Sequence, residues 1–146
     1  MNDRPILLVE DNPIDEDLTL RALRKHNIAG RVAVARDGAE ALDFLFARGV
    51  HAGRNGEGLP DIVLLDLNLP KLSGLDVLRE IRASDRTRLL PVVILTSSRE
   101  ERDLQAGYAG GANSYIVKPV DFTKFSEAVR QIGSYWLALN EHPHGR

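Results

Sequence analysis

The sequence contains no cysteine, and only one methionine and one tryptophan occur among its 146 residues. Without cysteine, the chain can form neither a disulfide framework nor a thiolate nucleophile, and zinc sites with cysteine ligands are excluded. No apolar run is long enough to span a bilayer, and the N-terminus lacks the pattern of a signal peptide. Basic charge is not in excess, because the net charge is −2, whereas a nucleic-acid-binding surface requires a basic face. We therefore expect a cytoplasmic protein that binds neither membranes nor nucleic acid.

Five short segments have the pattern of β-strands. Hydrophobic residues make up 43% of the chain, which is ordinary for one globular domain of this length. Apolar runs without alternation are typical of strands that are buried on both faces of a parallel sheet. Three such runs occur, at Ile6–Val9, Ile62–Leu65 and Pro91–Leu95. Two shorter strands are predicted at Val32–Val34 and Tyr115–Val117.

Helical patterns separate these strands. Apolar residues at intervals of three and four predict helices at Ile14–His26, Asp37–Ala47, Ser73–Arg82, Glu100–Tyr108 and Asp121–Leu139. The fourth of these helices has little apolar area, and the last has the strongest amphipathic stripe. Between the second helix and the third strand, the glycine-rich segment Arg48–Gly58 is expected to be a loop that carries a solvated His51.

Strands that alternate with helices in this way predict an α/β fold, a doubly wound five-stranded parallel sheet with five helices. We expect a single domain over residues 1–146. Its core covers about residues 5–132, and an extended last helix and tail occupy 133–146.

Polar side chains follow four of the predicted strands. Glu10 and Asp11 come after the first strand, Asp66 after the third, Thr96 after the fourth and Lys118 after the fifth. The carboxyl ends of parallel strands lie at one edge of the sheet, which is where ligands bind in such folds. We therefore expect these side chains to be close together. The alternative is that the carboxylates cap loops and that Lys118 forms an ordinary ion pair.

A cluster of three carboxylates requires a cation to offset its repulsion. Oxygen ligands without imidazole or thiolate match Mg²⁺ or Mn²⁺. A carboxylate beside a lysine can attack phosphorus as a nucleophile, and the positive charges can neutralise the phosphoryl oxygens. The residues at the strand ends therefore predict a metal-dependent phosphoacceptor, with Asp66 as the nucleophile.

The residues Glu10-Asp11, Asp66, Thr96 and Lys118-Pro119, in this order, resemble the receiver domain of response regulators in two-component signalling. The resemblance covers nearly the whole chain. It implies a flavodoxin-like fold with strand order 2-1-3-4-5. It also implies a protein that takes a phosphoryl group from a sensor histidine kinase onto Asp66.

The same resemblance assigns the other site residues. Mg²⁺ or Mn²⁺ is expected to bind Asp11, Asp66 and the backbone carbonyl of Asn68 directly, and to bind Glu10 through water. In the family, the lysine contacts the phosphoryl group, and the lysine–proline peptide that follows is usually cis.

Two further positions match the family's conformational switch. Thr96 is expected to move toward the phosphoryl group, and Tyr115 is then expected to rotate inward. The surface around the fourth helix, fifth strand and last helix would change as a result.

Finer features resemble single-domain regulators that work with phytochrome-type histidine kinases. They are the insertion Arg48–Gly58, the segment Asp66–Pro70, the run Thr96–Ser98 and the tail that carries Trp136. Because only a short tail follows the last helix, we expect output through another protein or through a homodimer. The dimer is expected to use the face of the fourth helix, fifth strand and last helix. Tyr135, Trp136 and Leu137 are consecutive, so at least one of them should be exposed.

An alternative is an enzyme, an aspartyl-phosphate hydrolase of the haloacid-dehalogenase type. Such enzymes also use an aspartate nucleophile, Mg²⁺, a hydroxyl and a lysine, but they place a second aspartate two residues after the nucleophile as a general acid. Here that position holds Asn68, which cannot supply a proton in this way. We therefore expect no enzyme that acts on a separate substrate, and only self-catalysed phosphotransfer and autodephosphorylation.

Overall fold

A computed structural model describes residues 6–26, 32–54, 58–119 and 121–141. Five parallel strands form one sheet in the order β2-β1-β3-β4-β5. They are β1 (Ile6–Val9), β2 (Val32–Ala35), β3 (Ile62–Leu65), β4 (Val92–Thr96) and β5 (Ser114–Val117). The predicted doubly wound sheet and its strand order are confirmed.

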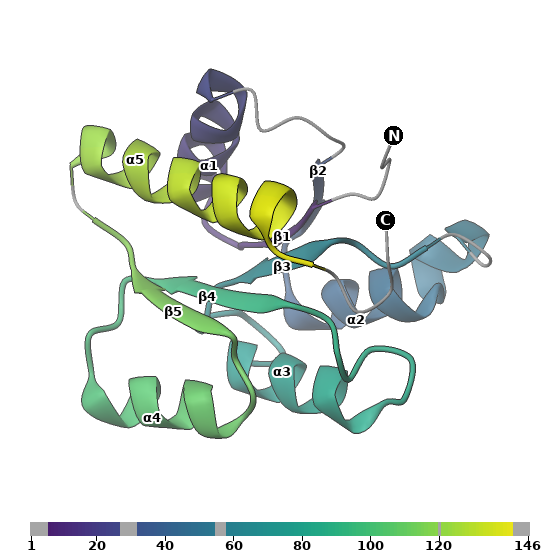
Figure 1. Ribbon diagram of the computed structural model, residues 1–146. Coiled ribbons are helices and arrows are strands. Elements are labelled where there is room, and N and C mark those ends of the chain that lie inside the picture. Colours follow the sequence, from purple (N-terminus) through teal and green to yellow (C-terminus); the bar gives the residue numbers. More distant parts are fainter. Residues whose placement is uncertain (1–5, 27–31, 55–57, 120, 142–146) are drawn as a thin grey trace.

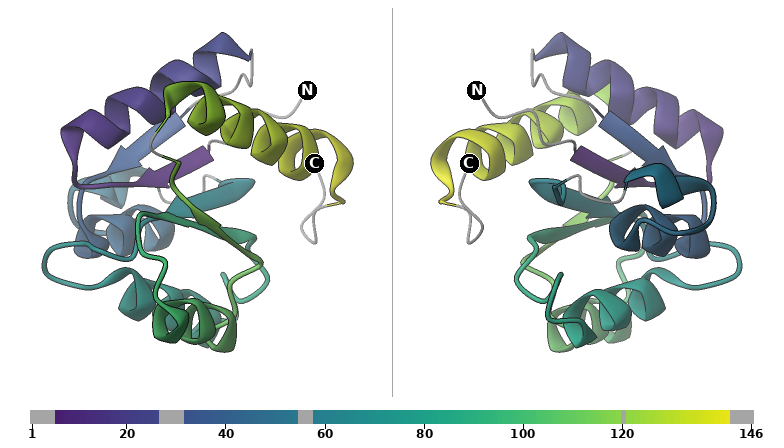
Figure 2. Two further views of the ribbon diagram at one scale, coloured as in Figure 1. Left: turned by 90° about the vertical axis from the view of Figure 1, so that its left-hand side faces the viewer. Right: turned by 90° about the vertical axis from the view of Figure 1, so that its right-hand side faces the viewer.

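Five α-helices cover the two faces of this sheet (Figures 1 and 2). They are α1 (Pro13–Lys25), α2 (Gly38–Phe46), α3 (Gly74–Ala83), α4 (Glu101–Ala109) and α5 (Phe122–Gly133). Helices α1 and α5 pack on one face, and α2, α3 and α4 lie on the other (Figure 1). Among the described residues, no helix is both long and apolar enough to cross a membrane.

Alternate residues of the central strands enter two separate apolar clusters. Leu7, Val63 and Leu65 are buried with the side chains of α2 and α3, whereas Leu8 and Leu64 are buried with those of α1 and α5. This two-sided burial is the physical reason for the unbroken apolar runs in the sequence.

The insertion after α2 is not the solvated loop that the sequence predicts. Residues Gly49–Arg54 form a 3₁₀ helix, η1. The Arg54 guanidinium lies 3.6 Å from the centre of the Phe44 ring and donates a hydrogen bond to the Phe44 carbonyl. His51 is partly buried, and its Nε2 atom lies 3.3 Å from Glu40 Oε2. The insertion packs on α2 because the side chains of Arg54 and His51 find partners there. Residues 55–57 lie outside the described part of the chain.

The last helix also departs from the prediction. The α-helix ends at Gly133 and continues as a π-helical segment, η2 (Ser134–Leu139). A π-helix bonds residue i to i+5 and therefore shifts the helical register. As a result Leu139, which the sequence places on the apolar stripe, is 73% exposed. Tyr135 is 50% exposed, which confirms that the three consecutive large residues are not all buried.

A close approach of two backbones fixes the start of α3 beneath the end of β3. The Gly74 amide donates a hydrogen bond of 2.9 Å to the Leu67 carbonyl. A β-carbon at Gly74 would lie 2.2 Å from the carbonyl oxygen of Asp66 and 2.7 Å from the Leu67 Cα atom. Both contacts are with backbone atoms, so no side-chain rotation can relieve them.

We predict that Gly74→Ala destabilises the protein, although alanine is the better helix former. The expected loss in the free energy of unfolding is about 1–3 kcal/mol, as for other overpacked sites, and urea denaturation measures it. Gly53→Ala is the matched control, because a β-carbon at Gly53 meets no atom within 4 Å. Equal stability of the two variants would contradict the prediction.

Candidate functional site

Three carboxylates meet at the carboxyl edge of the sheet, as the sequence predicts. Strands β1 and β3 are neighbours, with Val9 beside Leu65, so the residues that follow them also lie side by side. One carboxylate oxygen from each of Glu10, Asp11 and Asp66 lies within 4.8 Å of the others. Glu10 and Asp66 are buried and Asp11 is exposed. The cluster lines an open hollow, which gives a solute access to Asp66.

Lys118, which follows β5, bonds two of these carboxylates and a third one from α1. Its Nζ atom lies 2.5 Å from Glu10 Oε1, 2.9 Å from Asp15 Oδ2 and 3.1 Å from Asp66 Oδ2. The Lys118 side chain is 7% exposed. An ammonium group has three N–H donors, so one lysine bonds three carboxylates from three elements.

Asp15 is the site residue that the sequence does not predict. It lies in the first turn of α1, where a carboxylate is already explained by the helix macrodipole. Asn12 caps this helix, and its Oδ1 atom accepts hydrogen bonds from the Ile14 and Asp15 amides. The helix therefore begins beside the acidic cluster and points Asp15 at Lys118.

The second oxygen of Asp66 is held on the opposite side. Asp66 Oδ1 accepts a hydrogen bond of 2.9 Å from the Thr96 hydroxyl and one of 3.1 Å from the Asn68 amide. Thr96 is fully buried at the end of β4. Both carboxylate oxygens are thus fixed in direction, which limits rotation of the group.

Burial and charge shift the pKa values of the pair Glu10 and Lys118. Burial raises the pKa of Glu10 to about 7, against the opposing effect of the Lys118 hydrogen bond, and the nearby Asp66 charge adds to the rise. Burial lowers the pKa of Lys118, but its bonds to Glu10 and Asp15 and the charge of Asp66 outweigh this, so the net shift is upward. Lys118 therefore stays protonated.

The donor set fits a divalent cation. Among the described residues, four carboxylates, Glu10, Asp11, Asp15 and Asp66, line the hollow, and one ammonium group, that of Lys118, bonds three of them. Burial of Glu10 is the main cause of its raised pKa, and the negative charge of Asp66 adds to it. Oxygen-only ligands around an excess of negative charge are the environment that Mg²⁺ and Mn²⁺ prefer.

Tyr115 is partly buried in this structure. Its ring packs against the apolar cluster on the α2–α3 side, next to Gly107 of α4. The phenolic hydroxyl donates a hydrogen bond of 3.1 Å to the Ser98 carbonyl, and burial raises the pKa of this phenol. The expected inward rotation of Tyr115 after phosphorylation stays a prediction.

The expected cis peptide is not found. No cis bond occurs within the described ranges, so Lys118–Pro119 is trans. A trans bond before proline is the favoured form by about 0.5–1 kcal/mol. The Lys118 ammonium reaches its three carboxylates from this trans backbone.

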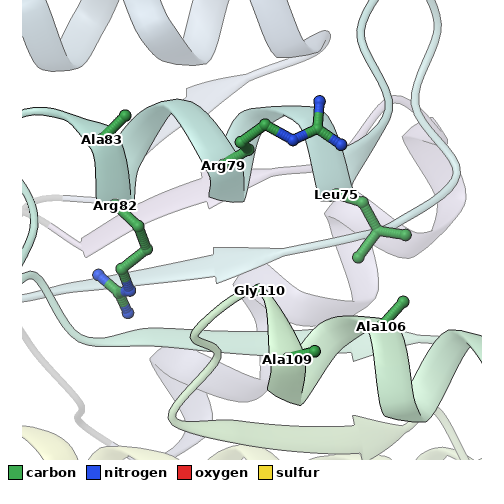
Figure 3. A pocket seen from close by; sticks show the side chains of 7 residues that line it. All are labelled: Leu75, Arg79, Arg82, Ala83, Ala106, Ala109 and Gly110. Atoms are coloured by element: carbon green, nitrogen blue, oxygen red, sulfur yellow. The ribbon is translucent and has the colours of Figure 1, made fainter.

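A second hollow lies between α3 and α4 and has a different character (Figure 3). The Arg82 guanidinium donates to the carbonyls of Gly111 and Leu90 and to the Asn113 side chain. These bonds hold together the loops that lead into β4 and β5. Arg79 is paired with Asp76 on its own helix. Both arginines therefore make structural contacts. No residue of the acidic cluster lines this hollow.

Comparison with known proteins points to one family. A model described as the response regulator receiver domain matches residues 6–130. The probable methanogenesis regulatory protein FilR2 of Methanothrix harundinacea is 44% identical over 138 residues, which cover 94% of this chain and 86% of FilR2.

Similar solved structures include regulators of phytochrome systems. The bacteriophytochrome response regulator AtBRR is 54% identical, with a TM-score of 0.78 over 97% of this chain and 100% of its own. The phosphorylated cyanobacterial phytochrome response regulator RcpA is 36% identical, with a TM-score of 0.89 over 97% and 99% of the two chains. The Mn²⁺-bound form of Rcp1 is also 36% identical, with a TM-score of 0.86 over 96% and 99%.

We predict that Mg²⁺ stabilises the fold, because a cation that binds only the folded cluster raises the free energy of unfolding. The expected gain is about 2.7 kcal/mol at a concentration one hundred times the dissociation constant. Asp11→Asn should remove most of this gain in urea denaturation. Asp17→Asn should keep it, since Asp17 is exposed and pairs with Arg21 away from the cluster. The same gain in both variants would rule out Asp11 as a ligand.

Proposed function

The chain belongs to the response regulator receiver domain family, as its sequence pattern predicts, and from this premise we propose that it is a phosphoacceptor switch whose phosphorylated residue is Asp66. The observation that carries the proposal is the environment of Asp66. One of its carboxylate oxygens is held by Thr96 and the Asn68 amide, and the other by Lys118. The group faces the open hollow of the acidic cluster.

The donor is proposed to be a phosphohistidine of a sensor histidine kinase. An Asp66 oxygen forms a bond to phosphorus while the phosphorus–nitrogen bond breaks. The electron pair stays on the imidazole nitrogen, which takes up a proton from water. Lys118 and Thr96 are already within hydrogen-bond distance of Asp66, so their donors can turn to the phosphoryl oxygens without a large movement.

Asp11, Asp66 and the backbone carbonyl of Asn68 would hold Mg²⁺ or Mn²⁺, with Glu10 acting through water. When bound, the metal supplies positive charge that neutralises the carboxylates and the transferred phosphoryl group. Support comes from the proximity of the three carboxylates and from the Mn²⁺-bound state of the similar regulator Rcp1.

Thr96 and Tyr115 are proposed to carry the signal away from Asp66. The Thr96 hydroxyl bonds Asp66, and the Tyr115 hydroxyl bonds the Ser98 carbonyl two residues beyond Thr96. The Tyr115 ring meets α4 at Gly107. A change at Asp66 therefore has a continuous path of contacts to the surface of α4.

The hydrolase alternative lacks its general acid. The residue two positions after Asp66 is Asn68, whose side chain is exposed and whose backbone amide bonds the carboxylate. An amide side chain cannot protonate a leaving group. The chain is accordingly proposed to act on no separate substrate, and to catalyse only its own phosphotransfer and autodephosphorylation.

The kinase partner is proposed to be of the phytochrome type, given the phytochrome regulators among the similar structures. We further propose that the protein is cytoplasmic and that residues 1–146 act as a single domain, with output through another protein.

Incubation with acetyl phosphate and Mg²⁺ tests the phosphoacceptor directly. Intact mass spectrometry should show the gain of one phosphoryl group on the wild type and none on Asp66→Asn. Asp85→Asn, at a fully exposed aspartate, should be labelled like the wild type. Thr96→Ala should be labelled roughly tenfold or more slowly, since a hydrogen bond to a charged group contributes about 1.5–3 kcal/mol. Labelling of Asp66→Asn, or equal labelling with a chelator, would overturn the proposal.

A homodimer through α4, β5 and α5 is also proposed. Strand β5 is at the edge of the sheet, so these elements share one side of the molecule (Figure 1). Tyr108 of α4 is 49% exposed and lies beside Tyr115 of β5, which offers an apolar contact for a second copy.

Sedimentation equilibrium should detect this dimer, and Tyr108→Ser should weaken it about tenfold or more, as expected for an aromatic residue at the centre of an interface. Val50→Ser is the control, because Val50 is 86% exposed on η1, outside the proposed face. A protein that remains monomeric with and without acetyl phosphate would refute the dimer.

A further inference from the structure

Asp15 contacts the site through Lys118 but is not one of the residues at the strand ends. Its Oδ2 atom accepts a hydrogen bond of 2.9 Å from the Lys118 ammonium. Its own side chain is 32% exposed, and it lines the hollow together with Asp66. Lys118 donates its other two N–H bonds to Glu10 and Asp66, so Asp15 accepts the third N–H bond of the ammonium group.

The backbone of Asp15 is firmly supported. Its amide donates to the Asn12 side chain, and its carbonyl accepts a hydrogen bond of 2.8 Å from the Thr19 hydroxyl. Both bonds belong to the first turns of α1, a helix that packs beside α5 on the same face of the sheet. Asp15 therefore presents its carboxylate to Lys118 from a rigid element.

The three partners of Lys118 differ in what the phosphoryl transfer does to them. Asp66 changes from a carboxylate to an acyl phosphate and loses its own negative charge at the carboxyl group. Glu10 belongs to the proposed metal set and is buried. Asp15 neither reacts nor belongs to that set, so the transfer leaves its carboxylate chemically unchanged.

We propose that Asp15 is the positioning residue for Lys118, which it holds toward Asp66 before and after the phosphoryl group arrives. This inference rests on the proposed function of Asp66. A lysine side chain has four rotatable bonds and loses much conformational entropy when it is fixed. Asp15 fixes it in advance, so that the ammonium is in place when charge develops on the phosphoryl oxygens.

Two other readings of Asp15 make different predictions. As an ordinary helix N-terminal carboxylate, it would affect stability alone. As a negative charge at the mouth of the hollow, it would slow the approach of an anionic donor, and it would do so whether or not residue 118 is a lysine.

A double-mutant cycle separates these readings. The rate of phosphoryl gain from acetyl phosphate with Mg²⁺ is measured for the wild type, Asp15→Asn, Lys118→Met and the double variant. The quantity compared is the factor by which Lys118→Met lowers the rate of phosphoryl gain. This factor should be roughly tenfold smaller in the Asp15→Asn background than in the wild-type background, which is within the range of couplings between contacting residues. In the Asp17→Asn background, which alters the same helix outside the hollow, the factor should not change.

If Lys118→Met lowers the rate by the same factor in the Asp15→Asn and wild-type backgrounds, and the wild type gains a phosphoryl group normally, this inference is overturned and the proposed function stays intact. This holds even where Asp15→Asn lowers stability or speeds the reaction of every variant. A wild type that gains no phosphoryl group overturns the proposed function, and the inference with it.

A second measurement covers the case in which Lys118→Met does not fold. Nitrogen-detected NMR of the lysine ammonium groups reports how fast the Lys118 Nζ protons exchange with water. Exchange should be faster in Asp15→Asn by about tenfold, the equivalent of one lost charge-assisted hydrogen bond, and unchanged in Asp17→Asn. Equal exchange in Asp15→Asn and the wild type overturns the inference.

Discussion

The ammonium group of Lys118 is the contact on which the rest of the site depends. It joins Glu10 after β1, Asp15 in α1 and Asp66 after β3 from its own place after β5. Removal of one partner of a buried ion pair costs roughly 3–5 kcal/mol, because it leaves an uncompensated charge in a poorly solvated place. The carboxylates at this edge can therefore lie close together only while a cation stays among them.

The sheet creates this constraint through its topology. Parallel strands that are buried on both faces bring every carboxyl end to one edge. The register of β1 beside β3 and of β4 beside β5 then sets which end residues are neighbours. At Gly74 the start of α3 closes on the backbone of Asp66. The position of Asp66 is thus fixed by backbone packing before any side chain of the site contributes.

The sequence predicts the sheet and the strand-end residues because both follow from local rules. An unbroken apolar run indicates a strand with two buried faces, and the first polar residue after it indicates the edge. Asp15 escapes prediction because its position has a sufficient local explanation in the helix dipole, while its contact with Lys118 spans 103 residues of chain. The π-helical segment after α5 could not be predicted for another reason. The residue types of Ser134–Leu139 do not distinguish i+5 hydrogen bonding from the i+4 bonding of an α-helix.

Helix α4 is held in place by fewer buried residues than α3. Gly107 is its buried residue, and its N-cap Glu100 makes no side-chain capping bond within the described structure. By contrast, α3 has a complete capping box and buries Val77, Leu78 and Ile81. Elements with few buried contacts open at the lowest free-energy cost. The low burial of α4 therefore supports the proposal that a change at Asp66, transmitted through Thr96, Ser98 and Tyr115, shifts the position of this helix.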